Sequence, residues 1–205
     1  LAAIKKNNEV INNQPMYNHK VVENKAYPFG LYFLESKRGY SRLEIGKNRK
    51  TEAVLKFKTK DKAKEILEKV IHDYNLCLQV NSGIKSENSC FKYKVNECKG
   101  ACLKEEPKDE YNQRIEDFVA LTKFPAETFL ILDKGRRGIE KSFYLIEDNQ
   151  FKGYGYYEYH QQIKSLEKIH HILIPIKETE EVVNMLKYFL YKISNNPNQV
   201  ILFNE

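Results

Sequence analysis

Residues 76–115 read LCLQVNSGIKSENSCFKYKVNECKGACLKEEPKDEYNQRI, and they contain every cysteine of the chain. The spacing is Cys77-x12-Cys90-x7-Cys98-x3-Cys102, and residues 75–104 follow neither a helical nor a strand period. Something other than a large apolar core must therefore order this segment. Four thiolates that share a metal ion or an iron-sulfur cluster would do so in a reducing compartment, where disulfides are the poorer explanation.

The spacing does not select the metal. Zinc sites usually pair their ligands as C-x2-C, and only Cys98 and Cys102 approach that pattern. Iron-sulfur clusters are also held by four thiolates and accept varied spacings. The alternative to a metal site is that the four cysteines are small buried hydrophobic residues.

The segments before the cysteines predict a small sheet covered by a helix. PFGLYFLE (28–35), GYSRLEIG (39–46) and AVLKFKT (53–59) are rich in aromatic and branched residues and are separated by turn-like sequences, which predicts a three-stranded antiparallel meander. Residues 59–74 predict a helix with Thr59 or Asp61 as its cap. Its apolar stripe consists of Ala63, Ile66, Leu67, Val70 and Ile71.

The segments after the cysteines repeat this arrangement. A helix over 107–121 is followed by three probable strands, TFLILDKG (128–135), KSFYLIED (141–148) and FKGYGYYEY (151–159), which form a second meander. The glycines of the third strand, Gly153 and Gly155, indicate a bulge rather than a phosphate-binding loop. An amphipathic helix over 178–193 and a last strand, QVILF, close the chain.

We therefore predict an α+β fold of two small antiparallel meanders with covering helices, joined by a four-cysteine connector stapled by a metal or cluster. The predicted parts are a trailing helix in 1–20, a first α+β unit in 21–75, the connector in 76–104 and a second α+β unit in 105–205.

Composition restricts the function only broadly. The chain has 34 Lys and Arg against 28 Asp and Glu, a formal charge of +6, which suits either a solvated lysine-rich surface or a face that binds nucleic acid. No stretch has the roughly 18 apolar residues that a membrane span needs, and the N-terminus lacks the apolar core of a secretory signal. We expect a cytoplasmic protein without membrane partners.

Four short patterns in the quoted segment resemble a known family. They are Cys-Phe-x-Tyr (90–93), Cys-x-Gly-Ala-Cys (98–102), Glu-Glu (105–106) and Tyr-Asn-x-Arg (111–114). Together they resemble the cysteine-rich segment of GIY-YIG nucleases of the UvrC type. The version most similar is fused to a DnaQ-like exonuclease, the epsilon-subunit type of DNA polymerase III, and is related to the UvrC homologue Cho.

The resemblance implies a cofactor and a parent protein. It implies a [4Fe-4S] cluster on Cys77, Cys90, Cys98 and Cys102, with zinc as the second choice. Residues 1–20 would be the remnant of the last GIY-YIG helix, and the catalytic residues of the exonuclease and GIY-YIG domains would precede Leu1. The chain would then be the non-catalytic C-terminal portion of a bacterial DNA repair or replication nuclease.

That portion would bind DNA or partner proteins. The alternatives are an independent metal-stapled interaction module without a DNA role, and a nuclease in its own right, which needs an acid cluster that the sequence does not display.

Two groups of residues are candidates for DNA contact. The first lies beside the cysteines and combines aromatic rings for stacking with cations for phosphates: Phe91, Lys92, Tyr93, Lys94 and Lys99. The second is a turn with Lys134, Arg136 and Arg137. Alternatively, the first group is an exposed strand or turn, or Phe91 and Tyr93 are core residues, and the second is a solvated hairpin turn.

Two other groups are expected to have no catalytic role. The acids Glu105, Glu106, Asp109 and Glu110 precede or begin a helix, where negative charge is favourable, so we interpret them as structural. His170 and His171 are adjacent in sequence and point in different directions, and no acid or cysteine is placed to complete a site with them.

Overall fold

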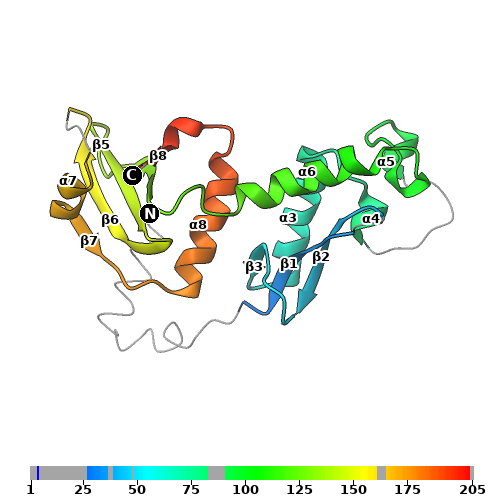
Figure 1. Ribbon diagram of the computed structural model, residues 1–205, viewed down its shortest axis with the longest axis horizontal. Helices are drawn as coiled ribbons and strands as arrows, with labels where there is room; N and C mark the ends of the chain where they lie inside the picture. The colour runs from blue at the N-terminus through cyan, green and yellow to red at the C-terminus, as the bar shows by residue number, and fades with distance from the viewer. Residues whose placement is uncertain are drawn as a thin grey trace. The chain divides into compact units, whose positions relative to one another are not determined.

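The computed structural model describes Ile4 and residues 27–36, 39–47, 49–82, 91–160 and 165–203. The chain divides into two compact units. Residues 25–122 form the middle unit, and residues 1–24 together with 123–205 form the terminal unit. Each unit has one antiparallel sheet with helices packed on it (Figure 1).

The sheet of the middle unit has three antiparallel strands in the order β2-β1-β3. They are β1 (Phe29–Leu34), β2 (Arg42–Lys47) and β3 (Leu55–Phe57). β1 and β3 lie within runs that the sequence predicted, β2 extends one residue beyond its run, and the antiparallel pairing is confirmed. The prediction of a meander is wrong for this sheet, because a meander would place β2 in the centre, and the central strand is β1.

The chain crosses over one face of β1 on its way from β2 to β3, which explains this order. In the crossing, the guanidinium carbon of Arg49 lies 5.1 Å from the centre of the Tyr32 ring. Gly30 leaves room for the crossing chain, since a Cβ at that position would come within 2.8 Å of the Cβ of Ala53. Alternation of apolar residues carries no information about such a crossing, so the sequence pattern could not predict it.

Helix α3 (Lys60–Asp73) contacts all three strands of this sheet. Its cap is Thr59, whose hydroxyl accepts a hydrogen bond from the Lys62 N–H at 3.2 Å. The predicted stripe is confirmed, because all five of its residues are buried: Ala63, Ile66, Leu67, Val70 and Ile71.

The second long helix of the middle unit is α6 (Lys108–Leu121), which begins directly after Pro107. It buries Tyr111, Ile115 and Phe118 and leaves Val119 partly exposed. Three short elements lie between α3 and α6 in sequence: α4 (Leu78–Ser82), α5 (Phe91–Lys94) and the 3-10 helix η2 (Ala101–Leu103).

The sheet of the terminal unit has five antiparallel strands in the order β7-β6-β5-β4-β8. The predicted meander is confirmed in β4 (Phe129–Lys134), β5 (Glu140–Glu147) and β6 (Gln150–Glu158), and the predicted last strand is confirmed in β8 (Val200–Leu202). The sequence did not predict β7 (Leu173–Pro175), which extends the meander at the edge of β6.

The predicted bulge is confirmed between β5 and β6. Leu145 pairs with Gly153 and the next residue, Ile146, pairs with Phe151, so one residue of β6 has no opposite partner. Gly153 has φ +154, and a Cβ there would lie 2.3 Å from the carbonyl oxygen of Ile174. A glycine is therefore needed at this position.

Both faces of the terminal sheet are covered (Figure 1). Helix α8 (Glu180–Ile193), capped by Thr179, packs Val182, Leu186, Leu190 and Ile193 on one face, and Ile4 joins the same core. Helix α7 (Leu166–His171) packs Ile169 on the other face, and η3 (Pro197–Gln199) precedes β8. Apart from Ile4, the predicted trailing helix in 1–20 lies outside the described residues.

The predicted class is confirmed as α+β with two antiparallel sheets and helices packed on them. The predicted stapling of residues 76–104 by a metal remains a prediction. Within the described ranges, no helix is long and apolar enough to cross a membrane.

Candidate functional site: the cysteine connector and two basic segments

The described cysteines of the connector, residues 76–104, occupy two places. Cys77 is buried and lies directly before α4. Cys98 and Cys102 are partly buried and flank Gly100. These three thiols form no disulfide. The fourth predicted ligand, Cys90, lies within 83–90, outside the described residues.

A buried amide holds the start of the connector. Asn81, in α4, accepts a hydrogen bond at Oδ1 from the Leu43 N–H of β2 at 2.8 Å. Its Nδ2 donates to the Cys77 carbonyl and to the Tyr111 hydroxyl, each at 2.8 Å. Burial raises the pKa of the Tyr111 phenol well above its usual range, so the hydroxyl stays protonated. Asn81 thus joins α4 to both β2 and α6.

A second amide holds the segment that enters β2. Asn112, in α6, accepts from the Ser41 N–H at 2.8 Å and donates to the Gly39 carbonyl at 3.1 Å. Ser41 and Leu43 are two residues apart, so their N–H groups point to the same side of the strand. β2 is an edge strand, and these two side-chain amides satisfy N–H groups that the edge would otherwise expose.

A tight turn brings Cys98 and Cys102 close to Tyr93. Gly100 has φ +84, and a Cβ there would lie 2.9 Å from Cε2 of Tyr93. The Tyr93 hydroxyl donates to the Glu105 carboxylate, and this bond is the main reason that the pKa of the phenol is raised. Gly100 lies against the Tyr93 ring, so Cys98 and Cys102, each two residues from Gly100, lie close to this ring, and they raise that pKa to a smaller extent.

The described cysteines fit the predicted site only in part. Cys102 lies in η2, which packs against α4, the helix that directly follows Cys77. Among the residues that the structure describes, however, no three His, Cys, Asp or Glu side chains come close enough together to hold a metal ion. A four-cysteine site needs Cys90, so the cluster remains a prediction.

One of the four predicted structural acids is buried. Glu106 contacts Arg114, with Oε1 2.7 Å from Nη1, and its side chain is 1% exposed. That oxygen accepts no well-aligned hydrogen bond from the described residues, so the contact is an ion pair. Arg114 also donates from Nε to the Tyr74 carbonyl at 2.9 Å. The pair therefore joins the start of α6 to the end of α3.

The first predicted DNA-binding group lies in and after α5. Phe91 is 74% exposed, and no residue of α5 is buried, so the alternative that Phe91 and Tyr93 are core residues does not hold. Lys92 lies 3.9 Å from Glu97, and Lys99 lies 3.5 Å from Glu110. Two of the three lysines therefore face an acid of the chain itself, and Lys94 has no ion pair within the described ranges.

The second predicted group, the turn after β4, is partly engaged within the chain. Arg136 donates from Nε to Glu140 at 3.0 Å and lies 4.0 Å from the centre of the Tyr156 ring. The pKa of Glu140 is lowered to about 2, chiefly by this hydrogen bond. Lys134 and Arg137 are exposed and have no ion pair in the described part of the chain.

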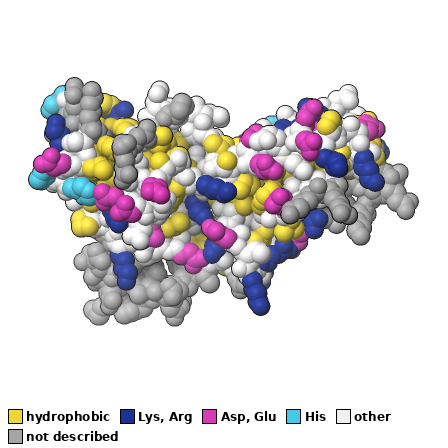
Figure 2. Space-filling view, viewed as in Figure 1, with side chains coloured by type: hydrophobic (Ala, Val, Ile, Leu, Met, Phe, Trp, Pro, Cys, Tyr) yellow, Lys and Arg dark blue, Asp and Glu magenta, His cyan; other side chains and the backbone are white. Residues whose placement is uncertain are grey.

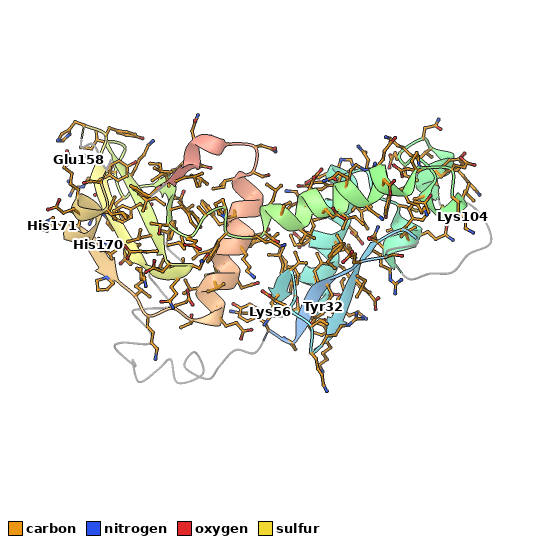
Figure 3. All side chains as sticks on the ribbon, viewed as in Figure 1. Tyr32, Lys56, Lys104, Glu158, His170 and His171 are labelled. Atoms are coloured by element: carbon orange, nitrogen blue, oxygen red, sulfur yellow. The ribbon has the colours of Figure 1, made fainter. Side chains whose placement is uncertain are left out.

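One acid does lie beside the histidine pair. Nε2 of His170, which is labelled in Figure 3, lies 3.0 Å from Oε1 of Glu147, which comes from β5. The sheet brings together residues that are 23 positions apart, which adjacency in sequence could not indicate. No third ligand-type side chain completes a metal site there among the described residues.

Comparison with known proteins finds two similarities. Residues 29–121 match the family model of the UvrC/Cho excinuclease middle domain. The chain is also 27% identical over 131 residues to UvrABC system protein C of Chlorobium chlorochromatii (strain CaD3). This alignment covers 60% of the chain and 20% of that relative, so the chain spans about a fifth of the relative's length. No solved structure matches the chain significantly.

These similarities support the UvrC-like part of the resemblance. They do not extend to a DnaQ-like exonuclease. Sequence reasoning missed Asn81, Asn112 and Arg114, whose contacts fix the connector in place. Their only signal in the sequence is the Tyr-Asn-x-Arg pattern, which contains two of the three.

Proposed function

We propose that the chain is a non-catalytic, DNA-binding portion of a bacterial DNA repair or replication nuclease related to UvrC. The observation that carries the proposal is the match of residues 29–121 to the UvrC/Cho excinuclease middle domain, since these residues nearly coincide with the middle unit. The proposed mechanism is binding: this portion positions DNA or a partner while catalytic domains of the parent protein cut.

The exposed ring of Phe91 supports DNA contact beside the connector. An aromatic side chain that is 74% exposed on a helix without buried residues contributes little to packing, and it is suited to stacking on an unpaired base. The alternative of an interaction module without a DNA role draws support from Lys92, Lys99 and Arg136, whose charges are paired within the chain.

Salt-dependent binding distinguishes the two functions. Fluorescence anisotropy with labelled single-stranded and duplex DNA should show an affinity that falls steeply as salt rises. Phe91→Ala should weaken single-strand binding by roughly 5- to 100-fold, as expected for loss of one stacked base. The matched control is Leu202→Ala, which removes another exposed apolar side chain, 49% exposed, outside both predicted DNA-binding groups. A chain that binds neither DNA at low salt has the alternative function.

We also propose that Cys77, Cys90, Cys98 and Cys102 hold a [4Fe-4S] cluster, with zinc as the second choice. The reduced thiols, the packing of α4 on η2 and the placement of Cys98 and Cys102 near one ring support this ligand set. Such a cluster would supply a structural cross-link and a redox-active centre.

Metal analysis after anaerobic purification tests the cluster. We expect iron and sulfide in equal amounts and a brown colour that Cys98→Ser abolishes. The control Tyr93→Phe keeps all four thiols and should keep the colour. Zinc without iron would select the second choice, and a metal-free protein would mean that the cysteines serve packing alone.

We further propose that the parent protein carries exonuclease and GIY-YIG domains before Leu1. The support is the sequence resemblance, which includes the fused version. The gene sequence upstream of the codon for Leu1 tests this, because an open reading frame without those two domains would exclude that parent.

A further inference from the structure

The positive charge of the chain is concentrated in one segment that neither predicted DNA-binding group includes. Residues 42–58 carry six Lys and Arg side chains against two Glu, a net charge of +4, whereas the whole chain carries +6. These residues span β2, the crossing and β3, so they belong to a single small sheet.

Alternation along the strands directs Arg42, Lys56 and Lys58 away from α3, whereas Lys47 lies on the same side of the sheet as Leu43. Leu55 and Phe57 of β3 are buried beneath the helix, so Lys56, which lies between them, and Lys58, which follows Phe57, point to the other side. On β2, Leu43 is buried and its neighbour Arg42 is exposed. The crossing adds Lys50, which is exposed.

This side of the sheet has no helix on it among the described elements, and basic side chains gather there. Figure 3 labels Tyr32 and Lys56, which lie on adjacent strands. In Figure 2, Lys and Arg side chains cluster over the part of the middle unit where Figure 1 draws β1, β2 and β3. We call Arg42, Arg49, Lys50, Lys56 and Lys58 the cationic face.

Two arginines of the cationic face share one carboxylate. Nε of Arg42 lies 3.5 Å from one oxygen of Glu44, and Arg49 bonds to the other oxygen. The hydrogen bond from Arg49 is the main reason that the pKa of Glu44 is lowered. One carboxylate between two guanidinium groups leaves a net positive charge. The position of Arg49 is fixed further, because its backbone N–H donates a hydrogen bond to the Tyr32 hydroxyl at 3.1 Å.

We propose that the cationic face binds the phosphate backbone of nucleic acid. Guanidinium groups held in a fixed orientation suit phosphate oxygens, and flanking lysines add charge without base-specific contacts. The Tyr32 ring is buried beneath Arg49, and the Tyr27 ring lies 5.1 Å from Nζ of Lys58, so both rings pair with cations of the chain and we expect contacts to the backbone rather than to bases. The inference rests on the proposed function. It identifies the surface that supplies the sequence-independent part of the affinity for DNA.

A charge-matched pair of triple variants tests the face. The test variant is Lys50→Gln, Lys56→Gln and Lys58→Gln, which leaves the Arg42–Glu44–Arg49 cluster intact. The control variant is Lys60→Gln, Lys64→Gln and Lys69→Gln, which removes the same charge from exposed positions on α3. Both are compared with the unaltered chain by fluorescence anisotropy on labelled duplex DNA across a series of salt concentrations. Circular dichroism verifies that each variant is folded.

The test variant should bind duplex about tenfold more weakly at low salt, with a slope of log affinity against log salt reduced by about 2 to 3. The control should change affinity less than about twofold. Equal losses in both variants, or no loss in the test variant while the unaltered chain binds, would overturn the inference and leave the proposed function standing. An unaltered chain that binds no DNA at low salt would contradict the proposed function itself.

A polyanion competitor separates nucleic acid from an acidic protein partner. Poly-glutamate should displace labelled duplex only at much higher charge concentration than unlabelled duplex does. If poly-glutamate binds as tightly as DNA and the test variant loses both, the face is one for acidic protein segments and the nucleic-acid assignment is wrong.

Discussion

The buried amide of Asn81 should be the most sensitive polar position of the middle unit. Asn81→Ala removes the acceptor of the Leu43 N–H and the donor to the Tyr111 hydroxyl. The Cys77 carbonyl keeps a partner, because the backbone N–H of residue 81 also donates to it at 3.2 Å. The Leu43 N–H therefore loses its partner, and the Tyr111 hydroxyl keeps only its hydrogen bond with the Cys77 backbone.

The cost follows from the burial of those two groups. Leu43 and Tyr111 are both 0% exposed, so water cannot replace the lost hydrogen bonds. An unsatisfied buried group costs about 1 to 3 kcal/mol, so we expect a loss of at least this size in the free energy of unfolding the middle unit. Asn112→Ala is the matched control, since it also removes two bonds to backbone but at a partly exposed position, and should cost about 1 kcal/mol.

Native-state hydrogen exchange followed by NMR measures both effects at the relevant bond. The opening free energy of the Leu43 amide should fall by the full amount in Asn81→Ala, and that of the buried Leu31 amide should fall with it if the unit opens cooperatively. The Leu145 amide of the terminal unit serves as the internal reference. A loss at Leu43 below about 1 kcal/mol, or a loss no larger than that of Asn112→Ala, would refute the reasoning.

Three further changes test other contacts. Arg114→Met should destabilise the middle unit by about 3 kcal/mol in urea unfolding, because it leaves the Glu106 carboxylate buried and unpaired, and Glu106→Gln should cost less. Glu140→Gln should remove part of the acid sensitivity of the terminal unit. The folded-state pKa of this carboxyl is about 2, below its ordinary 4.5, so its ion pair stabilises the fold above pH 4.5 and is lost as the pH falls toward 2. If the substitution leaves the dependence of stability on pH unchanged in that range, this reasoning is contradicted. Gly100→Ala should destabilise the middle unit by about 1 to 2 kcal/mol, because φ is +84 and the new Cβ would contact Tyr93. Faster alkylation of Cys98 and Cys102 would show that the turn has opened, and an unchanged alkylation rate would contradict the prediction.

The sequence predicted those elements whose pattern is local. The stripe of α3 was predicted residue by residue, because a helical period and a Thr cap are readable within 15 residues. The second meander was predicted as well, since its strands follow one another and pair with their neighbours in sequence. The glycine bulge in β6 was predictable for the same reason.

The order of the first sheet and the contacts of the connector depend on residues far apart in sequence. Nothing near β2 indicates that the next strand pairs on the far side of β1, because the room that Gly30 leaves becomes visible only when the sheet is assembled. The bond between Asn81 and Leu43 spans 38 residues, and that between Asn112 and Ser41 spans 71. An isolated asparagine in a sequence carries no sign of such a partner.

Two of these contacts order the two ends of the connector. Asn81 fixes α4, and the pair of Glu106 with Arg114 fixes the start of α6, so both ends of the cysteine-rich segment are held by polar bonds that require no metal. A cluster on the four cysteines would therefore act on the chain between these ends rather than on the whole unit. The sequence alone suggested that only a metal could order residues 76–104, because polar contacts between distant residues leave no period in the sequence. Among the described residues, the buried amide of Asn81 and the buried ion pair of Glu106 with Arg114 account for the order at the two ends of this segment.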